Sequence, residues 1–163
     1  MDPPSWRLRP ANEKDGDAIR QLVFGVLVEY DLQPDPEGTD ADLKNVAVSY
    51  QLPGGLFDVL IDAAGEIVGA IGLFPVTKDC CELRKMYLAR GVRGQGHGRR
   101  LLEHALVEAA KRRFHRVELE TSSVLVEAIA LYEQHGFRPF TPTHLAPRCD
   151  LAYYLTLTPP ALS

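Results

Sequence analysis

The stretch from Gly91 to Leu106 reads GVRGQGHGRRLLEHAL and is the most informative part of this chain. Glycines alternate with other residues at 94, 96 and 98, and an amphipathic helical pattern follows at once. Two arginines, Arg99 and Arg100, stand where that helix begins. Because the start of a helix carries partial positive charge, arginines are unfavourable there unless an anion lies beside them. The stretch therefore predicts an anion-binding turn at the start of a helix.

Two common phosphate-binding turns do not fit this stretch. A strand, a glycine-rich turn and a helix together bind phosphate through free backbone N–H groups, and missing side chains let the phosphate approach. The P-loop motif ends in Gly-Lys-Ser or Gly-Lys-Thr, and neither occurs in the chain. The dinucleotide motif G-x-G-x-x-G, started from Gly94, would need a glycine at position 99, which is arginine. What remains is Arg-x-x-Gly-x-Gly at 93–98.

Hydrophobic periodicity, caps and breakers predict strands and helices along the whole chain. We expect Asn12 to cap the first helix, Ser122 or Ser123 to cap the last, and Gly136 to follow that helix in a left-handed conformation. A hairpin meander followed by strand, helix and strand implies an α/β (α+β) fold: a mixed central sheet of about six or seven strands with helices on both faces. In chain order we expect a strand at 5–10, a helix, a second helix from 39 to about 52, hairpin strands at 56–62 and 67–74, a strand at 80–88, a helix of about 16 residues from 98, a strand at 116–121, a helix before 136 and a strand at 149–157.

Length and charge limit the class of protein. A chain of 163 residues with a formal net charge of −4 fits one domain spanning 1–163 and argues against a general nucleic-acid binder. The charge is uneven, since the span 84–100 holds six Lys or Arg and no Asp or Glu. One basic segment in an acidic chain favours a specific anionic ligand, although a solvated basic surface would give the same pattern.

The sequence also bears on compartment and metals. No apolar run approaches the length of a membrane span, and the N-terminal MDPPSWRLRP lacks the apolar centre of a secretory signal. The three cysteines are odd in number, and adjacent Cys80 and Cys81 would point to opposite faces of a strand. We therefore expect a reduced, cytoplasmic protein. The five histidines form no H-E-x-x-H or Cys–His cluster, so no metal is expected.

Several motifs occur in the order and spacing of one family. RGQGHG at 93–98 fits the pattern [QR]-x-x-G-x-[GA]; ELRKMYL at 82–88 precedes it, LET at 119–121 follows, and AIALYEQHGF at 128–137 comes last. On these motifs the chain resembles the GCN5-related N-acetyltransferase (GNAT) superfamily, over roughly residues 5–157. The resemblance implies an acetyl-CoA-dependent N-acetyltransferase with that family's mixed-sheet fold. It further implies direct transfer in a ternary complex, without an acyl-enzyme.

The resemblance assigns the glycine turn to coenzyme A. In the family, backbone N–H groups of this turn hold the pyrophosphate at the helix start, which would explain the arginines there. The preceding strand pairs its backbone with the pantetheine arm, and a backbone N–H, here that of Leu88, polarises the thioester carbonyl. The side chain of His97 is expected to lean out beside the ligand. The residues implied to bind acetyl-CoA are Met86, Leu88, Arg93, Gly94, Gln95, Gly96, His97, Gly98 and Arg99.

Two side chains are the catalytic residues that the resemblance implies. Tyr132 matches the tyrosine of the family's LYExxGF motif and is the candidate general acid, since a phenol is protonated at neutral pH. Glu82 matches the glutamate that some histone-acetylating members use as a base, with Glu120 or a water chain as alternatives. On periodicity alone, Tyr132 would be a core residue and Glu82 an exposed residue paired with an arginine. Leu125 replaces the family's usual asparagine, which puts that contact with coenzyme A in doubt.

The acceptor is the part that the sequence leaves open. This fold selects it mainly with the first two helices, their connection and the last hairpin. The connection is acidic and carries Glu29, Asp31, Asp35, Glu37, Asp40 and Asp42. An acidic lip would favour a cationic acceptor, whereas a solvated loop would carry the same residues.

The resemblance bounds the partners without naming them. It implies a primary amine on a small molecule or a peptide, no nucleic acid and no membrane. Dimers are frequent in the family, and the apolar stretch 149–157 offers an edge for a homodimer. A catalytically silent coenzyme A sensor or regulatory module of the same fold is the alternative function.

Overall fold

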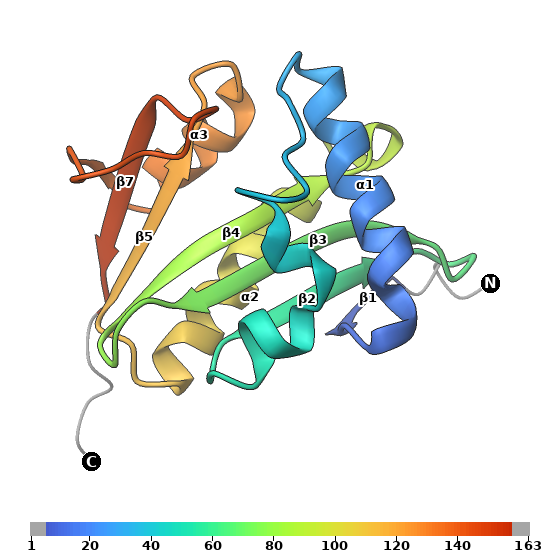
Figure 1. Ribbon diagram of the computed structural model, residues 1–163, viewed down its shortest axis with the longest axis horizontal. Helices are drawn as coiled ribbons and strands as arrows, with labels where there is room; N and C mark the ends of the chain where they lie inside the picture. The colour runs from blue at the N-terminus through green and yellow to red at the C-terminus, as the bar shows by residue number, and fades with distance from the viewer. Residues whose placement is uncertain (1–5, 158–163) are drawn as a thin grey trace.

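Among residues 6–157, which the computed structural model describes, seven strands form one sheet in the order β1-β2-β3-β4-β5-β7-β6 (Figure 1). Neighbouring strands are antiparallel except β4 and β5, which run parallel. The predicted fold class, a mixed sheet with helices on both faces, is confirmed. The strands are β1 (Arg7–Pro10), β2 (Leu56–Ile61), β3 (Ile67–Pro75), β4 (Cys80–Leu88), β5 (Arg116–Thr121), β6 (Arg138–Pro139) and β7 (Leu151–Thr156). The α-helices are α1 (Gly16–Glu29), α2 (His97–Lys111) and α3 (Val126–Gln134).

Part of what the sequence predicted lies outside the described residues. Residue 5 of the expected first strand and the first half of MDPPSWRLRP belong to this part, as do both ends of the predicted 1–163 domain. The extent of the domain therefore stays a prediction.

Helices cover both faces of the sheet, and each face has its own core. In Figure 1, α1 crosses in front of the sheet and α2 lies behind it. Ile19, Val23 and Leu27 of α1 pack on the front, where β2 is buried along its whole length. On the back, the predicted apolar face of α2 is confirmed, with Leu106 half-buried and the other members buried: Leu101, Leu102, Ala105 and Ala109.

β4 and β5 pair briefly and then diverge. Their parallel ladder joins 80–82 to 116–118, yet β4 continues to Leu88 and β5 to Thr121. Figure 1 shows the two strands opening toward the top of the view, between α1 and α3. Backbone groups along the opened edges have no ladder partner from the opposite strand, so a ligand can bond to them.

The predicted signals at Asn12 and Gly136 are confirmed. The Asn12 side chain accepts the Lys14 N–H, and Asp15 returns a bond to the Asn12 N–H, which completes a capping box on the 3-10 turn that leads into α1. Gly136 follows α3 with φ of 90°, a left-handed conformation that suits glycine.

The segment predicted as a second helix, from 39 to about 52, consists instead of two short turns. A 3-10 turn covers Ala41–Lys44 and a π-helical turn covers Ala47–Gln51. Asn45 separates them: its backbone is extended, and its side-chain oxygen accepts the Val48 N–H at 3.2 Å. Asparagine side chains compete in this way with continuous helical bonding.

Neither Ser122 nor Ser123 caps α3, which begins at Val126 without a side-chain cap. The N–H and hydroxyl of Ser123 bond instead to the carboxylate of Asp150, at 2.7 and 2.6 Å. The prediction failed because this partner is 27 residues away in the sequence.

The last strand is shorter than predicted and has a neighbour that the sequence did not suggest. β7 begins at Leu151, and β6 pairs with it over two residues, opposite Tyr153 and Tyr154. β6 covers part of the outer edge of β7, which leaves a short length of that edge unpaired. A homodimer formed through this edge stays a prediction.

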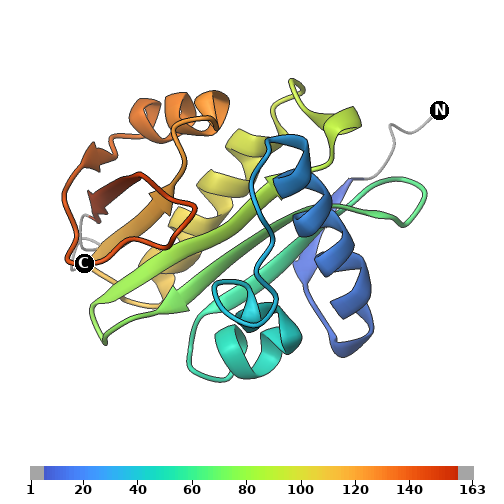
Figure 2. The same ribbon diagram turned by 45° about the horizontal axis from the view of Figure 1, so that its top comes forward.

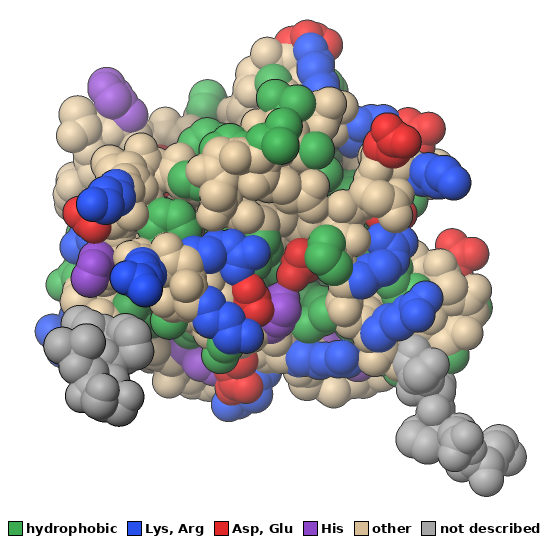
Figure 3. Space-filling model, turned by 90° about the horizontal axis from the view of Figure 1, so that it is seen from below, with side chains coloured by type: hydrophobic (Ala, Val, Ile, Leu, Met, Phe, Trp, Pro, Cys, Tyr) green, Lys and Arg blue, Asp and Glu red, His purple; other side chains and the backbone are tan. Residues whose placement is uncertain are grey.

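The side of the molecule opposite the diverging strands carries mixed charge. Figure 3 views it from below and shows Lys and Arg interspersed with Asp and Glu. A surface of this kind has no strong field of one sign to attract a polyanion. Within the described part of the chain, no helix has both the length and the apolar character needed to cross a membrane.

Candidate functional site

A cleft of about 750 Å³ lies where β4 and β5 diverge. Its walls come from β4, the end of β5, the glycine turn, α3, the end of α1 and the segment before β7. Figure 2 shows the glycine turn, α3 and the end of α1 along the top of the view, with β4 running below them. This volume is typical of a site for one small ligand. Of the predicted site residues, the cleft is lined by Glu82, Met86, Leu88, Arg93, Gly94, Gly96, Gly98, Arg99 and Tyr132, but not by Gln95 or His97.

The glycine turn leaves the start of α2 open. Gly94 and Gly96 are left-handed, with φ of 76° and 87°, and a Cβ built on either would meet nothing within 4 Å. Their conformation therefore excludes side chains and keeps space free. α2 starts at His97 without a side-chain cap, and the first N–H groups of a helix have no partners within it. Open N–H groups at the positive end of a helix dipole form a site for a phosphate.

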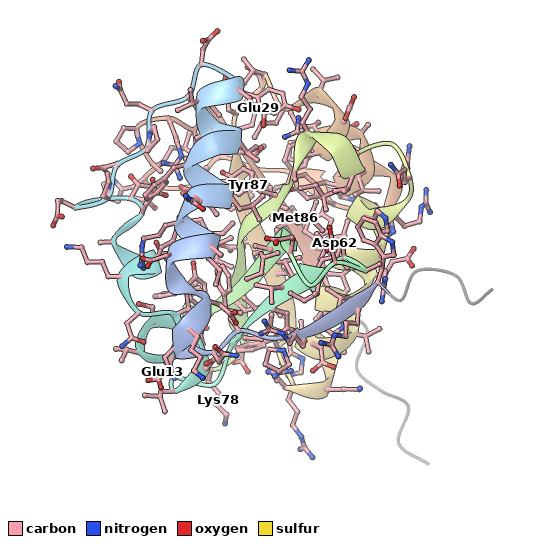
Figure 4. All side chains as sticks on the ribbon, turned by 90° about the vertical axis from the view of Figure 1, so that its right-hand side faces the viewer. Glu13, Glu29, Asp62, Lys78, Met86 and Tyr87 are labelled. Atoms are coloured by element: carbon pink, nitrogen blue, oxygen red, sulfur yellow. The ribbon has the colours of Figure 1, made fainter. Side chains whose placement is uncertain are left out.

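Arg93 fastens the turn to α1. Its Nε donates to the C=O of Leu88 at 3.0 Å, and its Nη1 donates to Glu29 at 2.9 Å. The guanidinium also lies over the ring of Tyr30, 5.4 Å from the centroid. Figure 4 shows Glu29 at the end of α1, on the side of β4 and the following turn. Arg99, by contrast, is more than half exposed at the start of α2.

His97 does not lean out beside the cleft as predicted. Its ring stacks on the indole of Trp6, with centroids 4.3 Å apart and planes 18° apart. Burial, followed by the charge of Arg100, lowers the pKa of His97. The prediction was wrong because the stacking partner, Trp6, lies just before β1 and far upstream in the sequence. Nothing in the sequence of the turn itself indicates this contact. The Gln95 side chain also bonds away from the cleft, to the C=O of Gly91 at 3.3 Å.

A bulge interrupts β4 at Lys85. The register with β3 shifts by one residue, so that Lys85 and Met86 together lie opposite Ile71. Lys85 has φ of 56°, a conformation that costs a residue with a Cβ about 1–2 kcal/mol. The extra residue reverses the alternation of the strand: Met86 and Leu88 pack on the core beside α2, and Tyr87 packs beside α1 (Figure 4).

The N–H of Leu88 points to the opened edge of β4. Just after the strand, the N–H of Ala89 donates to the C=O of Val68 at 2.8 Å, toward β3. Successive residues of an antiparallel strand direct their backbone groups to opposite edges. Those of Leu88 are therefore directed toward β5, and its C=O meets Arg93 rather than β3.

Glu82 and Glu120 line the cleft from opposite strands. Glu82 is the last residue of β4 that pairs with β5, and Arg84 donates to both of its oxygens, at 2.9 and 3.3 Å. Glu120 lies two residues beyond the part of β5 that pairs with β4 and has no ion pair within residues 6–157. Burial, and then the charge of Glu82, raise the pKa of Glu120. A raised pKa makes a carboxylate a better base near neutral pH.

Tyr132 is both a core residue and a cleft residue. It is 5% exposed, and its ring lies 5.7 Å from that of Phe137. Burial above all raises the pKa of its hydroxyl, with smaller effects of Tyr87 and Cys149. The hydroxyl therefore stays protonated at neutral pH and can donate a hydrogen bond. The two interpretations of Tyr132 from the sequence are thus compatible.

A buried ion cluster beside the cleft was not predicted. Asp40, whose side chain is fully buried, accepts bonds from Arg148 at 2.6 and 2.7 Å and lies 3.0 Å from Nζ of Lys85. Burial opposes ionisation of Asp40, but Arg148, the N–H of Asp35 and Lys85 outweigh it and lower its pKa to about 2. The cluster joins three distant parts of the chain. The one local signal was a lysine in β4 at a position that alternation assigns to the interior.

The six acids from Glu29, at the end of α1, to Asp42 do not form a free acidic lip. Four of the six lie in ion pairs with Lys or Arg: Glu29, Glu37, Asp40 and Asp42. The carboxylate of Asp35 accepts the N–H of Thr39. Paired acids give a weak net field, so the acidic composition of this segment does not by itself select a cationic acceptor.

The raised pKa values of the three thiols keep them mostly protonated at neutral pH. Cys80, Cys81 and Cys149 are free, and burial above all raises their pKa values to about 11, 12 and 11. Cys149 lines the cleft, but a protonated thiol is a poor nucleophile. Over the residues described here, no three His, Cys, Asp or Glu side chains are grouped to hold a metal ion.

Comparison with known proteins agrees with this geometry. Residues 25–137, more than half of the chain, match the acetyltransferase (GNAT) family. The chain is 39% identical over 140 residues to YjgM, an uncharacterised N-acetyltransferase of Escherichia coli K12, with 83% of each chain covered. A GNAT acetyltransferase from Staphylococcus aureus Mu50 shares the fold, with a TM-score of 0.88 and 22% identity over 94% of this chain and 100% of that chain. So does yncA of Salmonella typhimurium, solved with acetyl-CoA, with a TM-score of 0.70 and 22% identity over 98% of both chains. The chain therefore belongs to the GNAT family and is an acetyltransferase.

Proposed function

We propose that this enzyme transfers the acetyl group of acetyl-CoA to a primary amine in a ternary complex. The observation that carries the proposal is the open start of α2, behind two left-handed glycines, at the mouth of the cleft between β4 and β5. A fold likeness to a structure that contains acetyl-CoA does not by itself assign that ligand, so the fit must come from this chain's own residues.

The glycine turn fits the pyrophosphate of coenzyme A. Its N–H groups at the start of α2 are uncapped, and a side chain on Gly94 or Gly96 would occupy the space before them. An anion here also makes the position of Arg99 favourable, by about 0.3–1 kcal/mol. Arg93 does not bind the phosphate in this proposal. Its hydrogen bonds to Glu29 and to the Leu88 C=O hold the glycine turn in place.

Different groups in the cleft have different roles in the transfer reaction. When bound, acetyl-CoA supplies the acetyl thioester. The N–H of Leu88 hydrogen-bonds the carbonyl oxygen and stabilises the charge that develops on it. Glu120 accepts the proton from the amine nitrogen as the new C–N bond forms, and the hydroxyl of Tyr132 donates to the sulfur as the C–S bond breaks. We favour Glu120 over Glu82 because Arg84 already occupies both oxygens of Glu82.

Binding and turnover are tested first. Isothermal titration with acetyl-CoA is expected to show micromolar or tighter binding, and a free-thiol assay against a panel of small amines and lysine peptides identifies the acceptor class. Failure to bind acetyl-CoA would refute the proposal. The Tyr132→Phe variant is expected to bind as the wild type does but to lose turnover, which a coenzyme A sensor would not show.

The identity of the base is tested by matched amide substitutions. We expect Glu120→Gln to lower kcat/KM about 10²-fold or more and Glu82→Gln to lower it much less. The wild-type kcat/KM should rise with pH through a midpoint above 4.5, because the pKa of Glu120 is raised above that ordinary value. That rise should be absent in Glu120→Gln. The reverse ranking of the two variants would assign the proton transfer to Glu82.

A further inference from the structure

Lys85 occupies a backbone position that usually selects glycine. It is the first of the two bulge residues in β4, with φ of 56°. In bulges of this type the left-handed residue is ordinarily glycine, because a Cβ is strained there. Among the described residues, the other left-handed non-glycines are Asp31 and Arg113, which lie in exposed turns. Lys85 is the one inside a strand, and it is buried.

The ammonium group of Lys85 is held by one short segment. Its side chain is 5% exposed and lies 3.0 Å from Asp40 and 3.4 Å from Asp42, and it donates to the C=O of Thr39 at 3.3 Å. In a regular strand, residue 85 would face the same side as Cys81 and Leu83, which pack in the core beside α2. The ion pairs therefore exist only with the bulge, and they compensate its strain.

The bulge also sets the direction of the backbone beyond it. Because it adds one residue to β4, every later residue is turned to the opposite edge and face from those of an unbulged strand. Without it, the N–H of Leu88 would be directed to β3 instead of the opened edge.

We propose that Lys85 is a positioning residue: its ion pairs with Asp40 and Asp42 hold the bulge and thereby direct the Leu88 N–H into the cleft. This inference rests on the proposed function, in which that N–H meets the thioester carbonyl. Arg148 contributes to the same arrangement, since its two hydrogen bonds fix the carboxylate of Asp40 that pairs with Lys85.

Two substitutions separate conformation from charge. Lys85→Gly and Lys85→Met both remove the ammonium group, but only glycine adopts the left-handed conformation freely. We expect Lys85→Met to lower kcat about tenfold or more, because the Leu88 N–H would no longer polarise the carbonyl. We expect the kcat of Lys85→Gly to stay within about threefold of the wild type, because that N–H keeps its direction. Lys85→Arg keeps the cation and should recover most of kcat. KM for acetyl-CoA should change little, since the glycine turn is intact. Equal losses in the glycine and methionine variants would overturn the proposal.

Hydrogen exchange tests the proposal without acetyl-CoA or turnover. In the free wild type the Leu88 amide, at an opened strand edge, should exchange rapidly with solvent. In Lys85→Met it should become protected as it turns toward β3, whereas in Lys85→Gly it should remain rapid. This pattern in a protein that bound no acetyl-CoA would refute the proposed function and leave the role of Lys85 intact. Rapid exchange in every folded variant would overturn that role.

A control and a milder variant guard against loss of folding. Arg9→Met removes another ion pair, with Asp15 at 2.7 Å near the start of α1, and should leave the exchange of the Leu88 amide unchanged. If Lys85→Met does not fold, Asp42→Asn removes one of the two anions and should slow that exchange in part. Unchanged exchange in a folded Asp42→Asn variant would count against the proposal.

Discussion

Replacing Asp40 by asparagine should destabilise the protein strongly. The change keeps the size of the side chain but leaves Arg148 and Lys85, 11% and 5% exposed, without their shared anion. Removing one partner of a buried ion pair costs about 3–5 kcal/mol. We expect about 3 kcal/mol, the lower end of that range, because Asp42 still lies 3.4 Å from Lys85. For a chain of this length, that corresponds to a fall in Tm of about 6–12 °C.

Urea denaturation and thermal unfolding at pH 7 measure this loss. The matched control is Glu37→Gln, the same chemical change in the same segment, which breaks an ion pair with Lys44 whose side chains are 83% and 56% exposed. Exposed pairs contribute about 0–1 kcal/mol. If Asp40→Asn lowered the free energy of unfolding no more than the control does, the cluster would not be the stabilising element described here.

The same carboxylate makes stability depend on pH in acid. The pKa of Asp40 is about 2 in the folded protein against an ordinary 3.8, so the unfolded chain binds the proton first as pH falls. The stabilisation is therefore complete above about pH 4 and is lost as pH falls through about 2. The difference between the two pKa values corresponds to about 2.4 kcal/mol. The gap in unfolding free energy between wild type and Asp40→Asn should narrow by about 2 kcal/mol from pH 5 to pH 2, and a constant gap would refute the reasoning.

Three further outcomes follow from the glycine turn and its surroundings. Gly96→Ala places a Cβ at φ of 87° and should weaken acetyl-CoA binding about tenfold or more in isothermal titration, with a cost of about 1–3 kcal/mol in unfolding free energy. Trp6 is the only tryptophan in the sequence and stacks on His97, so its fluorescence should change as His97 titrates. The midpoint should lie below 6.5, the ordinary pKa of histidine, because burial lowers the pKa of His97. A His97→Gln variant that kept this transition would contradict its assignment to His97. A double-mutant cycle of Arg93→Met with Glu29→Gln should give a coupling of about 0.5–1 kcal/mol in unfolding free energy, and additive effects would show that this pair does not fasten the turn.

The sequence predicts those parts of the fold that depend on local patterns. Runs of β-forming residues between turn signals placed β2 to β5, and the 3.6-residue period placed α1 and α2. Asn12 and Gly136 were predictable because a cap or a left-handed residue acts within one helical turn. The glycine turn was predictable for the same reason, since its open backbone depends on Gly94 and Gly96 themselves.

What the sequence could not predict depends on partners far along the chain. His97 faces away from the cleft because Trp6 stacks on it, and Ser123 fails to cap α3 because Asp150 binds it. The bulge at Lys85 follows from an ion pair with a segment about 45 residues upstream, and not from any strand propensity of lysine. Such pairings appear only when the topology brings the segments together.

The basic segment 84–100 has a structural part that its composition does not indicate. Its excess of Lys and Arg suggested an anionic ligand, yet Arg84, Lys85 and Arg93 each pair with a carboxylate at 3.0 Å or less, and Arg99 pairs with Glu103 at 3.9 Å. The first three shape the site by fixing Glu82, the bulge and the turn. In the proposed function, the attraction for an anion comes instead from the uncapped N–H groups of α2 and from Arg99, which is exposed and only loosely paired with Glu103. In the proposed function, these paired basic residues therefore hold the walls of the cleft in place, and the backbone of the glycine turn makes most of the contact with the phosphate.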